Sequence, residues 1–171
     1  MLKRFLYLTF IFSAGVLKGH AQEREADLKA VFIYNFINYI DWDSGNDAPN
    51  FVIGIIGSSE VTRSLSQIAA GKTAKNKRIL IHVFSRPEDI QDCQILFIPQ
   101  NLPYSLQSIL DRIDKGVLTI SEETGYAEKG TAFNFFVKND KLKFEANLKA
   151  LDQAGLKAGS QLLKLAKIVN Q

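Results

Sequence analysis

The sequence predicts a single α/β domain with a mostly parallel sheet, helices on both faces and a C-terminal antiparallel hairpin. Between residues 51 and 121, apolar segments typical of strands alternate with segments typical of helices, as they do in parallel sheets. The continuous apolar run at 95–98 is typical of a strand that is covered on both faces. Two strands at 133–146, the first of them aromatic, flank Asn139 and Asp140, which favour a tight hairpin turn.

The helix expected at residues 23–41 has apolar side chains on two faces. One face carries the helically spaced set Leu28, Val31, Phe32, Asn35, Phe36, Tyr39 and Ile40, and a second carries Ile33, Tyr34 and Ile37. A helix that is apolar on most sides must be buried on most sides. Two interpretations stay open: a core helix packed under the sheet, or a helix shared with a partner subunit.

The remaining elements follow from strand-like runs and the turn residues between them. The expected order is a strand at 51–56, a helix at 59–70, strands at 78–84 and 94–98, a helix at 103–115, a strand at 117–121, the hairpin, and helices at 148–154 and 160–170 that meet at Gly155. The connection at 85–93 has room for only a short turn of helix. Ser58 or Ser59 suits the cap of the helix that follows the first strand, and the same position can bind an anion.

Residues 1–21 have the pattern of a secretory signal peptide. Lys3 and Arg4 precede an apolar run at 5–17, and residues 19–21 (Gly-His-Ala) suit a cleavage site. The apolar run is shorter than the roughly 20 residues that span a bilayer, so we expect no direct membrane insertion. We expect one domain at residues 22–171, exported to the periplasm.

The charge balance argues against a nucleic-acid partner. The chain has 21 basic and 18 acidic residues, but three basic ones (Lys3, Arg4 and Lys18) and no acidic ones lie in residues 1–21. The predicted domain therefore has 18 residues of each sign and a net charge of about zero. Such a chain does not have the basic surface that binds nucleic acid or anionic membranes.

Residues suited to catalysis or metal binding are scarce. The only histidines are His20, in the predicted signal peptide, and His82, and the only cysteine is Cys93. This leaves no credible zinc ligand set and no Ser-His-Asp triad. Glu122 and Glu123 follow a strand, but neighbouring residues in a loop do not converge on one substrate. We expect no enzymatic activity and no cofactor, and we expect Cys93 to be buried beside its apolar strand.

Two segments carry a resemblance to a known family. In the first, the helix sequence Lys-Ala-Val-Phe-Ile-Tyr-Asn-Phe (residues 29–36) is followed by Tyr39 and Trp42. In the second, Phe-Glu-Ala-Asn (residues 144–147) leads through Ala-Gly-Leu (154–156) to a Leu-rich tail at 160–166. Together with the strands near residues 55 and 95, these segments resemble the YfiR family of periplasmic signalling regulators.

The resemblance implies a non-catalytic regulator and a homodimer. It implies binding to the periplasmic sensor domain of an inner-membrane protein, a diguanylate cyclase in that family, and a histidine kinase is an open alternative. The residues expected at the partner or ligand surface are Tyr34, Asn35, Phe36, Phe133, Glu145 and Asn147. For Glu145 and Asn147, a structural role in hydrogen bonding at the strand-to-helix corner is as well supported as a role in recognition. For Glu145, a further alternative is an exposed strand position beside Lys143.

Two further implications concern the fold and its ligands. Many relatives pair a cysteine at the position of Cys93 with one in the first strand, where Gly54 stands here, so we expect no such bridge. The alternative to a protein partner is a small aromatic or apolar ligand held beneath Phe133 and Phe136. Phe136 is expected on the opposite face of its strand from Phe133 and Phe135.

Overall fold

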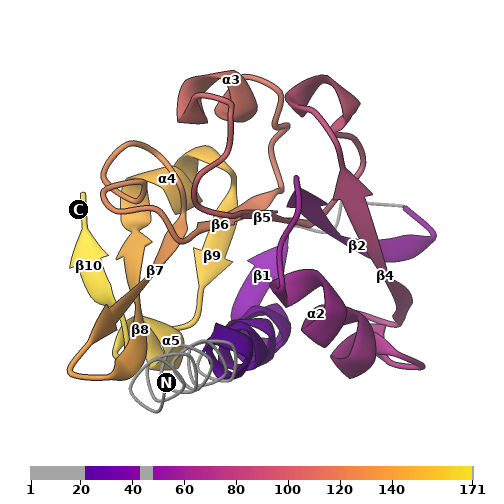
Figure 1. Cartoon of the computed structure of the whole chain (residues 1–171), viewed down its shortest axis with the longest axis horizontal. Coiled ribbons are helices and arrows are strands. Elements are labelled where there is room, and N and C mark those ends of the chain that lie inside the picture. The colour runs from indigo at the N-terminus through magenta and orange to yellow at the C-terminus, as the bar shows by residue number, and fades with distance from the viewer. Residues whose placement is uncertain (1–21, 43–47, 171) are drawn as a thin grey trace, which may run out of the picture.

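An eight-stranded sheet organises the computed structural model, which describes residues 22–42 and 48–170 (Figure 1). The predicted signal peptide lies outside these residues. The elements are a first helix at residues 22–39, β1 (Ile40–Trp42), β2 (Asn50–Ile56), α2 (Val61–Ala69), β3 (Thr73–Ala74), β4 (Lys77–Phe84), a 3₁₀ turn (Pro87–Asp89), β5 (Ile95–Ile98), α3 (Leu106–Leu110), β6 (Leu118–Ser121), β7 (Phe133–Lys138), β8 (Lys141–Asn147), α4 (Leu148–Gln153), β9 (Leu156–Ala158), α5 (Ser160–Leu163) and β10 (Lys167–Val169).

The predicted fold class is confirmed. The strand order is β10-β8-β7-β6-β5-β2-β4-β3, and neighbouring strands are parallel except for the pairs β7–β8 and β3–β4. A separate antiparallel pair joins β1 to β9. Helix α2 connects β2 to β4 in one direction, and α3 connects β5 to β6 in the other. The carboxyl ends of β2 and β5 are therefore the point at which the chain direction reverses, where open α/β sheets usually bind ligands.

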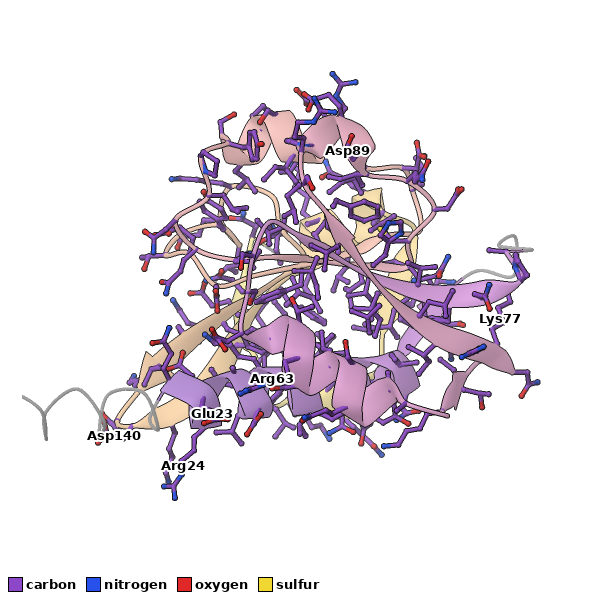
Figure 2. The ribbon with its side chains drawn as sticks, turned by 45° about the vertical axis from the view of Figure 1, so that its right-hand side comes forward. Glu23, Arg24, Arg63, Lys77, Asp89 and Asp140 are labelled. Atoms are coloured by element: carbon purple, nitrogen blue, oxygen red, sulfur yellow. The ribbon has the colours of Figure 1, made fainter. Side chains whose placement is uncertain are left out.

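Helices cover both faces of the sheet, as predicted. The first helix and α2 lie on one face, over a large apolar core that includes Ile33, Ile53 and Phe133 (Figure 1). Helix α3 lies on the other face, over a smaller core that includes Ile56, Leu96 and Ile109. Polar contacts join the first helix to α2, since Arg63 Nη2 lies 2.6 Å from Glu23 Oε1 (Figure 2). The Ser64 hydroxyl also donates to Asp27 Oδ1 at 2.6 Å.

The hairpin and its turn agree with the sequence. Strands β7 and β8 pair from Phe133–Ala146 to Lys138–Lys141. The two turn residues, Asn139 and Asp140, have φ values of 52° and 56°, as a type I′ turn requires. Asn and Asp tolerate this left-handed conformation better than most side chains, so local chemistry alone sets the register of this hairpin.

Two of the predicted helices are wrong in length. Helix α3 occupies only Leu106–Leu110, not 103–115, and begins where the Ser105 hydroxyl accepts a hydrogen bond from Ser108 N. The predicted helix at 160–170 ends at Leu163, and Lys167–Val169 form strand β10 against β8. The open edge of β8 satisfies the backbone groups of this tail better than one more helical turn does.

The predicted face of the first helix is only partly right. Phe36 and Ile40 are buried as expected, together with Ile33 and Ile37 from the second face. Leu28, Val31 and Tyr39 are instead 50%, 43% and 42% exposed. The helix is a core helix that keeps an apolar strip on its outer side.

Gly54 provides room for a ring from the next strand. A Cβ at Gly54 would lie 2.6 Å from Phe84 Cε2 and 3.2 Å from Leu96 Cδ1. Gly54 lies opposite Leu96 of β5, three residues beyond Cys93, so a cysteine at position 54 would be roughly 10 Å from Cys93 along the strand, too far for a disulfide. Cys93 is a free, buried thiol, which confirms its predicted burial.

We expect Gly54→Ala to destabilise the domain by about 1–3 kcal/mol, because the added methyl group collides with a buried ring. Urea unfolding of wild type and variant measures the loss. Combining Gly54→Ala with Phe84→Leu should cost less than the sum of the two separate changes. Full additivity would contradict the proposed collision.

Candidate functional site

Phe36 and Phe133 lie inside the core, where the first helix meets the hairpin. The Phe36 ring centroid is 4.9 Å from that of Phe133 and 5.0 Å from that of Phe144. Phe133 is also 5.4 Å from Phe144, and its side chain is fully buried. The space beneath Phe133 is thus filled by protein rings. Partner recognition by Phe36 and Phe133 stays a prediction, and in this structure it would have to be indirect.

A buried polar cluster lies on the opposite face of the same strands. Ser121 Oγ is 2.8 Å from Thr131 Oγ1 and donates to Asn134 Oδ1 at 2.7 Å. Asn134 Nδ2 donates to Glu145 Oε2 at 3.4 Å. The chain of contacts ends at Lys167, whose Nζ lies 2.8 Å from Glu145 Oε1. It thus connects β6, β7, β8 and β10 through side chains.

Glu145 is not the exposed strand residue that alternation suggested. It is 8% exposed, and its cationic partner is Lys167 of β10, in register with it, where Lys143 was expected. The hydrogen bond from Lys167 to Glu145, with their charge attraction, raises the pKa of Lys167. Lys167 Nζ also lies 6.0 Å from the centre of the Phe136 ring, which is on this face as predicted.

Asn147 holds the corner between β8 and α4. Its Oδ1 accepts a hydrogen bond from Ala150 N at 2.9 Å, which caps the helix. Its Nδ2 donates to the Ala127 carbonyl at 2.7 Å, and the residue is buried. Structural hydrogen bonding at the corner, one of the two roles expected for Asn147, is therefore present.

Tyr34 and Asn35 lie on the outer side of the first helix, whereas the other four predicted residues are buried. Asn35 is exposed and lies on the same line as Leu28, Val31 and Tyr39, the four residues that we call the helix stripe. Tyr34 is half-buried beside the stripe, and Lys72 Nζ lies 4.6 Å from the centre of its ring. Of the six predicted residues, only these two are accessible to a partner without rearrangement.

A hollow of about 670 Å³ lies at the carboxyl ends of β2, β5 and β6, and it includes Ser58 and Ser59, where the sequence allowed an anion to bind. Sequence reasoning missed the contribution of Lys29 to this site. Lys29 and Glu122 form an ion pair in its wall, with 2.5 Å between Nζ and Oε2, and Glu25 approaches Lys29 to 2.6 Å. Burial lowers the pKa of Lys29, but the hydrogen bonds to Glu122 and Glu25 outweigh it and raise this pKa overall. Ser58, Ser59 and Gln100 add polar lining. The position of Glu122 after a parallel strand was a sequence signal for a site at this end of the sheet. Its ion pair with Lys29, which is far away in the sequence, could not be inferred from the sequence.

The aromatic contacts of Phe36 join two segments that are far apart in the sequence, the first helix and the hairpin. A family model described as YfiR/HmsC-like matches residues 26–167, which include both segments. The chain belongs to the YfiR/HmsC-like family. This membership supports a periplasmic regulator of diguanylate cyclase signalling as the general role. In the described residues of this YfiR-like protein, no helix combines the length and the apolar character that crossing a membrane requires.

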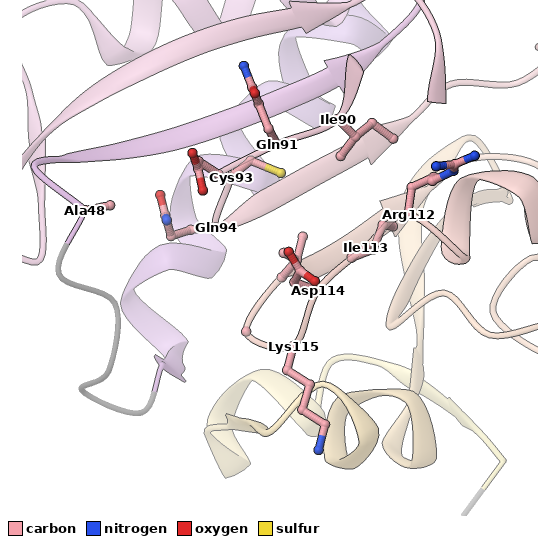
Figure 3. A pocket seen from close by; sticks show the side chains of 12 residues that line it. Ala48, Ile90, Gln91, Cys93, Gln94, Arg112, Ile113, Asp114 and Lys115 are labelled. Carbon is pink, nitrogen blue, oxygen red and sulfur yellow. The ribbon is translucent and has the colours of Figure 1, made fainter. Parts of the chain in front are cut away.

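The single cysteine of the YfiR-like domain lines a smaller hollow of about 140 Å³ (Figure 3). Cys93, Gln94, Gly116 and Val117 contribute to it from the amino ends of β5 and β6. This is the end of a parallel sheet that seldom carries a site. Burial raises the pKa of the Cys93 thiol to about 12.

We expect Asn147→Ala to destabilise the domain by about 1–3 kcal/mol, because it removes a helix cap and the shorter of two hydrogen bonds to the buried Ala127 carbonyl, which keeps only Gly130 N as a donor. The matched control is Ser105→Ala, which removes the exposed cap of α3 and should cost about 0.5–1 kcal/mol. Chemical denaturation measures both. Equal losses would show that the Ala127 hydrogen bond adds nothing.

Cys93 should react very slowly with thiol reagents at pH 8. With its pKa raised from 9.0 to about 12, the reactive thiolate is about 1000-fold rarer than for an unperturbed thiol. Labelling followed by mass spectrometry measures the rate, and the same protein in urea is the control. Comparable rates in the two states would contradict the burial of Cys93.

Proposed function

We propose that this protein is a non-catalytic, exported regulator that binds the periplasmic domain of an inner-membrane signalling protein and holds it inactive. Family membership favours a diguanylate cyclase as the partner, with a histidine kinase as the other candidate. The family resemblance also favours a homodimer. Export rests on the signal-peptide pattern of residues 1–21.

The helix stripe is the observation that carries this proposal. Leu28, Val31 and Tyr39 keep roughly half of their surface in water, although they belong to a helix that is otherwise packed on the sheet. Exposed apolar residues on one continuous line, with one amide among them, are typical of a protein-binding surface. Burial of each such side chain in an interface contributes on the order of 1 kcal/mol.

Inhibition requires no chemistry from this protein. A regulator that binds the inactive conformation of its partner more tightly than the active one shifts the population by that difference in affinity. A shift from 1:99 to 99:1 needs a difference of about 5.5 kcal/mol. The three apolar side chains of the stripe would supply about 3 kcal/mol of this difference, and polar contacts around the stripe would have to supply the rest.

The proposal excludes a catalytic role for the buried carboxylate. Glu145 forms hydrogen bonds with Lys167 and Asn134, and it does not line the hollow at the carboxyl ends of the sheet. Any turnover by this protein that Glu145→Gln abolishes without unfolding it would contradict the proposal.

We expect Val31→Asp to abolish partner binding, because it places a charge at the centre of the helix stripe. The mature chain (residues 22–171), fixed on a resin, is exposed to solubilised membranes, and retained proteins are identified by mass spectrometry. A membrane signalling protein should be retained by wild type and lost at least about tenfold with Val31→Asp. Cyclase activity of the membranes should fall when wild-type protein is added.

The matched control is Val137→Asp, which places the same charge at an exposed apolar position of β7. Circular dichroism and thermal unfolding establish that both variants fold. Equal retention by wild type and Val31→Asp would rule out the stripe as the binding surface. Equal loss in both variants would point to a general effect of charge.

A second candidate function is a small-molecule-binding module, and the hollow beside Lys29 and Glu122 favours it. This hollow occupies the place where open α/β sheets bind ligands, and its wall offers both charges and two hydroxyl groups. A ligand that raises the melting temperature of wild type but not of Lys29→Met would support it.

A further inference from the structure

One edge of the large sheet is left open over most of its length. Strand β4 pairs with β2 along Arg78–Phe84, but on its outer side β3 covers only Lys77 and Arg78. Ile79 N donates to the Lys72 carbonyl at 3.3 Å, which ends the covered part. Among the described residues, no strand pairs with the outer side of β4 beyond Ile79.

The directions of the backbone groups on this edge can be derived from two hydrogen bonds. The Phe84 carbonyl accepts from Gly57 N at 2.8 Å, on the inner side of β4. Ile79 N points outward to Lys72. Because successive residues of a strand point their backbone groups to opposite sides, Ile81 and Val83 point outward with Ile79. The N–H and C=O groups of Ile81 and Val83 are thus open for pairing.

The side chains along this open edge do not discourage pairing. No charged residue occurs between Ile79 and Phe84, and Leu80 and Val83 are 37% and 44% exposed. Proteins usually protect an open edge with charged side chains, lysine above all. The opposite side of the sheet follows that rule, since the part of β8 that β10 leaves open carries Lys141 and Lys143. The β4 edge lacks this protection.

We propose that a second copy of this chain pairs with the β4 edge, strand to strand and antiparallel, to form a two-fold dimer with a continuous sheet. The open groups determine the register. Ile81 of each copy pairs with Val83 of the other, which makes four new hydrogen bonds and uses none of the groups that Lys72 already occupies. His82 then lies directly opposite its own counterpart, with Cα atoms about 4.5 Å apart.

Self-complementarity favours a second copy over another protein as the occupant. In this register the Ile81 side chain of each copy lies opposite the Val83 side chain of the other copy, on the face of the sheet that carries α2. The two ends of β4 differ in charge. The turn before it carries Lys75. Arg86, Glu88 and Asp89 follow its other end, where Arg86 pairs with Asp89 at 3.2 Å and Glu88 leaves a net negative charge. Figure 2 shows Lys77 and Asp89 far apart on the molecule. Antiparallel pairing brings the basic end of each copy beside the acidic residues of the other.

This inference rests on the homodimer part of the proposed function and is independent of partner binding by the helix stripe. A register-specific crosslink tests it. In a Cys93→Ala background of the mature chain, His82→Cys should form an intermolecular disulfide under mild oxidation, because a separation near 4.5 Å suits this bond. The control is Leu80→Cys, whose two copies would lie roughly 14 Å apart in this register and should not crosslink.

Val83→Pro tests the same edge without oxidation. It removes an N–H group that points away from β2, so the fold should survive while the edge can no longer pair. Light scattering should give the dimer mass for wild type and the monomer mass for Val83→Pro, at equal thermal stability of the monomer fold. His82→Asp, which places two like charges opposite each other, should also give monomers.

Each outcome decides one point. A wild-type monomer at all concentrations would overturn the proposal and leave the edge to a strand from another protein. A dimer that persists in Val83→Pro and does not crosslink through His82→Cys would overturn the edge interface but not the homodimer. Equal crosslinking at both cysteine positions would overturn the register. Partner capture by the Val83→Pro monomer shows separately whether the proposed regulatory function survives.

Discussion

The packing of Phe36 is the interaction on which the arrangement of the molecule depends. Its ring lies among Phe32, Phe133, Phe135 and Phe144, with centroid distances of 4.9–6.1 Å, so one residue of the first helix joins that helix to both strands of the hairpin. The same helix is joined to α2 by Glu23 and Asp27 and to the end of β6 by Lys29. A single helix thus connects the parallel half of the sheet to the hairpin half, and its outer side is left for the stripe.

The parts of the fold that follow from local chemistry were predictable. The Asn139-Asp140 turn, the apolar strands and the burial of Cys93 each depend on residues close together in the sequence. Strand β10 was not predictable in this way, because the tail has good helical spacing and only a distant strand edge makes it extended. The prediction that Glu145 is exposed was wrong for the same reason, because Lys167 of β10 packs against Glu145 and pairs with it. The first helix is apolar on two faces, so the sequence could not show which of them the sheet would cover.

The recognisable motif residues of the site prove to hold the fold together. In the Phe-Glu-x-Asn segment, Phe144 packs on Phe36, Glu145 pairs with Lys167, and Asn147 caps α4. Each side chain therefore has a structural partner, which explains why the segment identifies the family without marking an accessible surface. Recognition of another protein by Glu145 and Asn147 stays a prediction, and it would need a rearrangement that exposes them. On the described surface, exposed large apolar side chains gather on the first helix and on β4, while Val137 and Leu165 are isolated examples elsewhere.

These two surfaces point in different directions, which has a consequence for regulation. The helix stripe faces away from the sheet, opposite the buried side of its helix, whereas the β4 edge lies in the plane of the sheet. A dimer formed through β4 would therefore keep both stripes uncovered. Two stripes held at a fixed separation bind two copies of a partner more tightly than one stripe binds one copy, because the second contact forms at high effective concentration. A regulator built in this way would also fix the spacing between the two partner domains, and a change in that spacing is a physical means by which a non-catalytic protein can hold a membrane enzyme inactive.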